Sequence, residues 1–233
     1  GIVSVQSHTA GSDNLLEEFL AALDEVVDPR VTVLRNDVGV RKREGLEPQP
    51  PRVVKGELNG PIEVKENGHS FEVDLLAGQK TGFFTDQRDK RAAIANYASR
   101  LPTGSSLLNC FCYTASFSIY ACRANWNIKT VNIDESIRAL DEAKRNFALN
   151  GIDLENHEFI SKDVFSYLDD CIEAGTTHDI VILDPPAFAK TAKDKPRALK
   201  AYARMARQGI SVTKPGGLLV LCSCSGSIDL NEF

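Results

Sequence analysis

Two patterns of apolar residues divide the chain near residue 78. Before this point, short β-like runs are separated by turn signals such as Asn59-Gly60-Pro61 and Asn67-Gly68. After it, apolar runs alternate with stretches in which apolar residues recur every three or four positions, a pattern typical of parallel strands joined by helices. The sequence therefore predicts a small α+β domain over residues 1–77, then a doubly wound, Rossmann-like α/β sheet over residues 78–233.

The small domain is expected to combine one helix with antiparallel hairpins. Asp13 is the candidate cap of the helix, and Asp28-Pro29 is its candidate end. The helical spacing is carried by five apolar residues, Leu16, Phe19, Leu20, Leu23 and Val27. Strands are predicted at residues 31–34, 38–41, 62–65 and 71–75, and a proline-rich loop at residues 44–51.

The larger domain is expected to alternate strands with helices. Thr85 or Asp86 can cap its first helix, which continues through Leu101. Strands are predicted at residues 106–110, 130–133, 157–161, 179–183 and 217–222, and further helices at residues 114–123, 136–150, 164–174 and 195–212.

The run from Asp179 to Lys190 is the most distinctive stretch of the chain. Four aliphatic residues precede Asp184, as in a strand that is buried on both faces. Pro185 and Pro186 then stop the strand and stiffen the loop that carries Phe188. Because open α/β sheets bind ligands at the carboxyl ends of their strands, we expect Asp184 at a binding site. The alternative is that Asp184-Pro185-Pro186 only terminates the strand.

The first strand-to-helix turn, at residues 109–117, predicts the type of cofactor. It lacks the G-x-G-x-x-G that holds a dinucleotide pyrophosphate, which disfavours a nicotinamide dehydrogenase. S-adenosylmethionine carries no phosphate and fits such a turn. Asp134, which ends the second strand, could accept both ribose hydroxyls, and Asp163, after the third strand, could accept the adenine amino group. For Asp134, a helix cap is the alternative.

Composition and charge narrow the class of protein. The six cysteines show no C-x-x-C spacing, so neither a metal site nor a disulfide framework is expected. No apolar stretch is long enough to cross a membrane and the amino terminus does not resemble a signal peptide, so we expect a cytoplasmic protein. The net charge of -5 is unevenly distributed, because residues 185–207 carry seven basic residues against Asp194 alone. This basic run, which includes Lys190, Lys193, Lys195, Arg197, Lys200, Arg204 and Arg207, follows the expected site and could meet phosphates.

Five segments in one order resemble the bacterial large-subunit ribosomal RNA methyltransferase I family. They are residues 41–47, 78–88, 109–114, 184–188 and 223–226. The resemblance implies a class I S-adenosylmethionine-dependent enzyme that forms 5-methylcytosine in 23S ribosomal RNA. Family members typically add an amino-terminal RNA-binding PUA domain and further strands at the carboxyl end, so we expect the chain to be a fragment. Ala115-Ser116 departs from the glycines that are usual in relatives.

The resemblance assigns Cys224 as the nucleophile and gives Asp184 the hydrogen bond to the N3 edge of the base. Carbon 5 of cytosine becomes nucleophilic only after a thiolate adds to carbon 6. A second cysteine often helps release the product, but Ala187 follows the two prolines here, so the releasing base is left open. Cys222 is expected to pack in the core.

The expected site combines residues of the strand ends, the turns that follow them and the basic run. Expected cofactor contacts are Gln87, Arg88, Asn109, Phe111, Tyr113, Thr114, Asp134, Asp163 and Asp184. Expected substrate contacts are Pro185, Pro186, Phe188, Lys193, Lys195 and Arg197, with ribosomal RNA as the partner; Arg41, Lys42 and Arg43 are the alternative RNA surface. The alternative functions are a methyltransferase acting on an exocyclic amine or ring nitrogen of a purine and a non-catalytic RNA-binding remnant. A homodimer is also left open.

Overall fold

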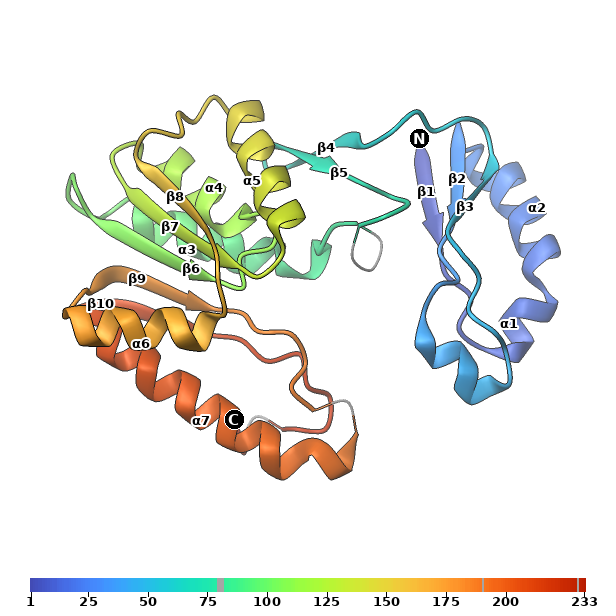
Figure 1. Ribbon diagram of the computed structural model, residues 1–233. Coiled ribbons are helices and arrows are strands. Elements are labelled where there is room, and N and C mark those ends of the chain that lie inside the picture. Colours follow the sequence, from blue (N-terminus) through green and yellow to red (C-terminus); the bar gives the residue numbers. More distant parts are fainter. Residues whose placement is uncertain (79–81, 190, 230) are drawn as a thin grey trace. The chain divides into compact units, whose positions relative to one another are not determined.

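The computed structural model describes residues 1–78, 82–189, 191–229 and 231–233 (Figure 1). Of the residues singled out above, Gln79, Lys80, Thr81 and Lys190 lie outside this set. The chain forms two compact units. The first comprises Gly1–Val64 and Glu72–Gln87, and the second comprises Lys65–Phe71 and Arg88–Phe233. The division expected near residue 78 stays a prediction.

The first unit is built on a three-stranded sheet in the order β1-β2-β3. β1 (Ile2–Val5) and β2 (Val31–Leu34) are parallel, and β3 (Arg52–Lys55) pairs antiparallel with β2. α1 (Ala10–Asn14) and α2 (Leu16–Val27) connect the parallel strands. The expectation of antiparallel hairpins was therefore wrong for this sheet, because a helical crossover joins its first two strands.

Two local predictions in this unit are corrected by Arg41. Residues 38–41 are not a strand, since Gly39–Glu44 forms a 3₁₀ helix. The buried Arg41 guanidinium donates to the carbonyl oxygens of Ser7 and Glu47 and pairs with Asp13 at 2.7 Å. Asp13 is therefore not the cap of the predicted helix: it lies within α1, and α2 follows Leu15, which makes no side-chain capping hydrogen bond. Both errors come from tertiary contacts that local spacing does not encode.

The hairpin of β4 (Ile62–Glu66) and β5 (His69–Val73) is shared between the units. Its tip is anchored inside the second unit by the buried carboxylate of Glu66, which accepts two hydrogen bonds of 2.8 Å from Arg91. The Tyr120 hydroxyl donates to the same carboxylate at 2.8 Å. Ser70 and Asn150 add a reciprocal pair of hydrogen bonds.

The second unit is a five-stranded, wholly parallel sheet in the order β10-β9-β6-β7-β8. This arrangement confirms the doubly wound α/β prediction. The strands are β6 (Ser106–Cys110), β7 (Lys129–Asp134), β8 (His157–Ser161), β9 (His178–Leu183) and β10 (Thr213–Leu221). The helices are α3 (Arg88–Ala98), α4 (Ser116–Ala124), α5 (Ile137–Leu149), α6 (Val164–Ala174) and α7 (Lys195–Val212). In Figure 1, α6 and α7 lie on one face of the sheet and α3, α4 and α5 on the other.

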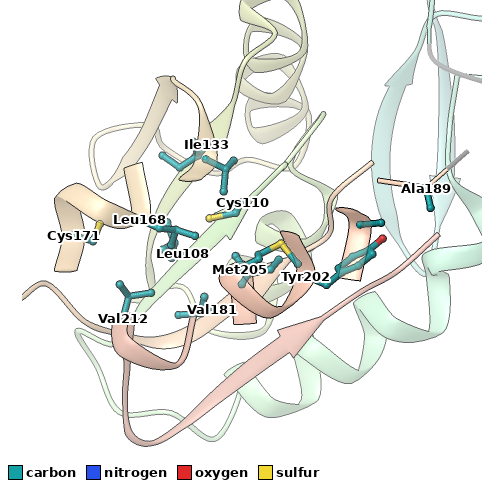
Figure 2. Close-up of a cluster of buried hydrophobic side chains, with 13 residues drawn as sticks. Leu108, Cys110, Ile133, Leu168, Cys171, Val181, Ala189, Tyr202, Met205 and Val212 are labelled. Carbon is teal, nitrogen blue, oxygen red and sulfur yellow. The ribbon is translucent and has the colours of Figure 1, made fainter. Parts of the chain in front are cut away.

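The core beneath α6 and α7 fixes the positions of the strand ends (Figure 2). Leu108, Val181 and Leu183 of the sheet meet Leu168 and Met205 of the helices, and each of these side chains is fully buried. Gly209 lets α7 approach closely, because a Cβ there would come within 2.7 Å of a Leu183 methyl group. Burying a leucine side chain contributes about 1.5–3 kcal/mol, so this cluster stabilises the carboxyl edge of the sheet.

No helix in the described part of the chain is both long and apolar enough to span a bilayer.

Candidate functional site

The strand order changes direction between β6 and β9, which makes their carboxyl ends the expected ligand edge. β7 and β8 lie on one side of β6, and β9 and β10 on the other. Cys110 and Leu183 are paired in register, so the β6–α4 turn and Asp184 begin side by side. Open α/β sheets bind ligands at such a switch point.

The β6–α4 turn carries three non-glycine residues in left-handed backbone geometry. Phe111, Tyr113 and Ala115 have φ values of 57°, 49° and 56°. Left-handed geometry costs roughly 1–2 kcal/mol for an L-residue, and strain of this kind concentrates at functional sites. Thr114 lies buried within the same turn. Ala115, expected to depart from the family pattern, takes the left-handed backbone geometry that glycine adopts without strain.

Asp134 joins two turns of the site. Its Oδ2 accepts the backbone N–H of Tyr113 at 2.9 Å, and its Oδ1 accepts that of Ser136 at 2.9 Å. The first bond holds Tyr113 in its left-handed conformation and the second orders the start of α5. The cap of α5 is Ser136, whose hydroxyl accepts the Ala139 N–H, so Asp134 is not itself the helix cap. Its binding of ribose hydroxyls stays a prediction.

Asp163 lies farther along the same edge, two residues beyond β8. It is the cap of α6, and its Oδ1 accepts the backbone N–H and the hydroxyl of Ser166, each at 2.8 Å. The side chain is exposed. A role toward adenine stays a prediction.

Asn109 belongs to a buried polar chain that crosses the sheet. Its amide donates to the Ser118 hydroxyl at 2.9 Å, and Ser118 donates to Asn132 at 2.6 Å. Asn132 in turn donates to Thr130, which contacts His157 at 3.0 Å. This chain ties β6, β7 and β8 to α4. Asn109 therefore supports the turn from inside the sheet, and direct contact with a cofactor stays a prediction.

The loop after β9 is held by packing at both ends. Asp184 is half-buried, Pro185 is buried and Pro186 is exposed. The Phe188 ring lies between Tyr202 and Phe165, at centroid distances of 4.8 and 6.0 Å. Phe188 thus fixes the loop against the α6–α7 core.

Cys224 is the exposed cysteine of this edge. Its thiol contacts the Pro185 carbonyl oxygen at 3.7 Å. The serines on either side are both bound to Tyr202, because Ser223 donates to the Tyr202 hydroxyl at 3.0 Å and Ser225 contacts it at 3.0 Å. Ser225 also accepts the Ala189 N–H at 3.2 Å, so Ser225 connects the Cys224 loop with the Asp184 loop. The remaining five cysteines are buried.

Cys222 is buried, as expected, and its backbone is also hydrogen-bonded to β9. Its backbone N–H donates to the Leu183 carbonyl at 2.9 Å. Burial, together with the nearby Asp184 carboxyl group, raises the pKa of the Cys222 thiol to about 12, so the thiol stays neutral.

The remaining predicted residues lie on other elements. Gln87 ends the 3₁₀ turn Thr85–Gln87 of the first unit, and exposed Arg88 pairs with Asp89. Lys193 and Arg197 are exposed, whereas Lys195 pairs with Glu232 at 2.6 Å. Among the described residues, no group of histidine, cysteine and acidic side chains could hold a metal ion.

Sequence reasoning missed the residues that support the site. Tyr202 lies in the helix predicted at residues 195–212, but its hydrogen bonds with Ser223 and Ser225 depend on how that helix packs. The proximity of Cys222 to Asp184 depends on the register of β9 and β10. The alternation Cys-Ser-Cys-Ser at residues 222–225 was the available signal, because successive residues of an extended segment face opposite sides and the two serines both bond Tyr202.

Comparisons with known proteins agree with this geometry. A family profile described as S-adenosylmethionine-dependent methyltransferase matches residues 50–231. Proteins named ribosomal RNA large subunit methyltransferase I are 38% identical over 232 residues in Pseudoalteromonas translucida and 40% identical over 232 residues in Alteromonas mediterranea. Both alignments cover 100% of this chain, which spans 57% of the length of each relative.

Solved structures share the fold. SMU.776, complexed with SAH, superposes with a TM-score of 0.82 at 26% identity, over 99% of this chain and 57% of that one. A SAM-dependent methyltransferase from Agrobacterium tumefaciens gives a TM-score of 0.64 at 21% identity, over 82% of this chain and 59% of that one, and supports the fold alone. The matched profile covers the sheet, the strained turn and the Cys224 loop described above. The chain belongs to the S-adenosylmethionine-dependent methyltransferase family.

Proposed function

We propose that this chain carries the catalytic part of an enzyme that methylates carbon 5 of cytosine in large-subunit ribosomal RNA. The observation that carries the proposal is the exposed Cys224 thiol, 3.7 Å from the Pro185 carbonyl at the ligand edge of the sheet. The names of the relatives support the choice of ribosomal RNA. This substrate places the protein in the cytoplasm.

The residues at the edge fit S-adenosylmethionine. The β6–α4 turn contains small and aromatic side chains, and Asp134 offers a carboxylate at the end of β7. When bound, S-adenosylmethionine supplies an electrophilic methyl group. We assign Asp134 to the ribose hydroxyls and Asp163 to adenine, with the residues of the turn beside them.

Cys224 makes the cytosine ring reactive. Its thiolate adds to carbon 6, and the electron pair of the ring double bond becomes available at carbon 5 for the new carbon–carbon bond. Removal of the carbon 5 proton by a base then restores the double bond and expels the Cys224 thiolate. Asp184 holds the N3 edge of the base. It follows β9, and β6 lies between β9 and β7, the strand that ends in Asp134. Pro185 and Pro186 keep the Asp184 carboxyl group from moving with the loop.

The test is covalent trapping. An RNA whose target cytosine carries fluorine at carbon 5 cannot lose a proton there, so the enzyme should remain attached to it in the presence of S-adenosylmethionine. The change Cys224→Ser should abolish both the adduct and the methylation of unmodified ribosomal RNA. Cys171→Ser, at a buried cysteine of α6 remote from the edge, is the control and should retain both.

Two other outcomes would identify a different function. An active Cys224→Ser enzyme that forms no adduct would indicate methylation of an amine or ring nitrogen. Such an enzyme uses an aromatic side chain to stack the extruded base, whereas Phe188 packs against Tyr202 and Phe165. Failure to bind S-adenosylmethionine in calorimetry would instead indicate an RNA-binding remnant.

A further inference from the structure

Cys224 lies in a turn that its two serine neighbours close. The Ser223 hydroxyl accepts the backbone N–H of Ser225 at 3.3 Å. A serine turn of this type fixes the backbone of the residue between the two partners, and here the Cys224 thiol lies 3.7 Å from the Pro185 carbonyl oxygen. Because Ser223 and Cys224 are exposed, water competes with this bond, so by itself it holds the turn only weakly.

The turn has a second support in the hydroxyl group of Tyr202, on α7. This hydroxyl accepts from Ser223 at 3.0 Å and lies 3.0 Å from the Ser225 hydroxyl, so it bridges the side chains on both sides of Cys224. A phenol can accept one hydrogen bond while it donates another, so both contacts can form together. Ser225 is 4% exposed and also accepts the Ala189 N–H at 3.2 Å. The bridge therefore continues into the loop after β9.

The ring of Tyr202 is itself held in the core. Tyr202 is 4% exposed and lies in the interior of the 18-residue helix α7. Its ring packs against Phe188 and Phe233, at centroid distances of 4.8 and 5.1 Å. In Figure 2 the ring lies in the buried cluster, with its hydroxyl on the side of Ala189. The packing of the ring therefore sets the position of the hydroxyl and, through it, that of the Cys224 turn.

We propose that Tyr202 is a positioning residue, whose hydroxyl group holds Cys224 in register with the loop that binds the substrate base. The thiol has to approach carbon 6 of a ring whose N3 edge is held by Asp184, so the two loops must keep a fixed separation. The hydrogen bonds that join Tyr202, Ser225 and Ala189 provide this connection. The inference rests on the proposed function, because it needs Cys224 to attack a base.

The experiment measures two rates: methylation of unmodified large-subunit ribosomal RNA, and formation of the covalent adduct with RNA that carries 5-fluorocytosine. Tyr202→Phe removes the hydroxyl and keeps the ring in the core. Because small errors in the placement of a nucleophile lower the rate strongly, this variant should lower kcat and the adduct rate about tenfold. The KM for RNA, and the affinity for S-adenosylmethionine in calorimetry, should not change. Loss of packing alone would not produce this split between kcat and KM.

Tyr120→Phe is the matched control. Tyr120 is 2% exposed, and its hydroxyl donates to the Glu66 carboxylate at 2.8 Å. It belongs to α4, which lies on the opposite face of the sheet from α7 (Figure 1). The control removes the same chemical group from an equally buried site, so it should lose thermal stability without losing kcat.

Ser225→Ala tests whether Tyr202 acts through the connection between the loops. This variant should slow adduct formation about as much as Tyr202→Phe. The double variant should be slowed by less than the product of the two single effects, because both changes break the same connection.

The outcomes separate this role from the proposed function. A Tyr202→Phe enzyme with wild-type kcat and adduct rate would overturn the positioning role and leave the cytosine assignment intact. Single effects that multiply in the double variant, or a raised KM at unchanged kcat, would do the same. A wild-type enzyme that forms no adduct would overturn the proposed function and the role of Tyr202 together.

Discussion

At the scale of single residues, the site depends on carboxylates that each do more than one task. Asp134 holds the strained Tyr113 and the start of α5 at the same time. Asp184 directly follows β9 and lies beside Cys222, which directly follows the neighbouring strand β10. Substitutions at these positions should therefore be compared with variants that preserve part of the hydrogen bonding.

Replacing Asp134 tests the binding role. Asp134→Ala should weaken S-adenosylmethionine binding by roughly 1.5–3 kcal/mol, the range for a hydrogen bond to a charged group. Asp134→Asn keeps an acceptor for one of the two backbone N–H groups, so it should be more stable to heat than Asp134→Ala. Calorimetry and thermal unfolding measure the two effects. Equal cofactor affinity in the wild type and the alanine variant would show that Asp134 only orders the turns.

The buried side chain of His178 should make the free energy of unfolding depend on pH. This histidine begins β9, is 4% exposed, and has neither ring nitrogen hydrogen-bonded. Burial, together with the Lys214 ammonium, lowers its pKa from 6.5 to about 4. Between these values the unfolded chain binds a proton that the folded chain does not, so stability should fall as pH drops from 6.5 toward 4, by at most roughly 3 kcal/mol.

The check is urea unfolding as a function of pH. His178→Leu removes the titrating group and two buried polar atoms, so its stability curve should be flatter between pH 6.5 and 4. Other acid-sensitive groups are common to both proteins. A variant with the same slope as the wild type across this window would assign the loss to those groups instead.

At the scale of elements, the parallel sheet was predictable and the first unit was less so. The strand at residues 157–161 and the helix at residues 164–174 have the predicted limits, because period and turn residues agree there. β1 and β3 were missed, since their apolar residues form no clear run. The 3₁₀ helix at Gly39–Glu44 depends on Arg41, whose partners Ser7 and Asp13 are distant in sequence. The sequence does not encode the order of the strands, so the neighbours of Asp184 could be expected only from the general topology of open α/β sheets.

The anchoring of the hairpin tip gives an element-scale prediction. Arg91→Ala would leave the Glu66 carboxylate buried without its cation and should destabilise the second unit by about 3–5 kcal/mol. Arg204→Ala, which breaks an ion pair with Asp169 whose side chains are 53% and 49% exposed, is the control and should cost less than about 1 kcal/mol. Chemical denaturation measures both. Similar losses in the two variants would mean that the hairpin tip contributes little to the stability of this unit.

At the scale of the whole molecule, charge separates two surfaces that sequence alone presented as alternatives. The basic run after the site is largely exposed at Lys193, Arg197 and Lys200. In the first unit, Arg41 is 1% exposed and paired with Asp13, so of the three consecutive basic residues only Lys42 and Arg43 are exposed. The exposed charges at the start of α7 are thus the better candidate for meeting an RNA backbone.

Salt dependence tests this surface. Replacing Lys193, Arg197 and Lys200 with glutamine should weaken binding of ribosomal RNA and lower the slope of log K against log salt by about one unit for each lost phosphate contact. Lys195 is left in place because Glu232 neutralises it. Affinity for S-adenosylmethionine should not change, which shows that the fold persists. Lys42→Gln with Arg43→Gln is the matched comparison. If the Lys42→Gln, Arg43→Gln variant alone lowered the slope, RNA would bind through the first unit. Lys193, Arg197 and Lys200 would then be solvated surface residues without an RNA contact.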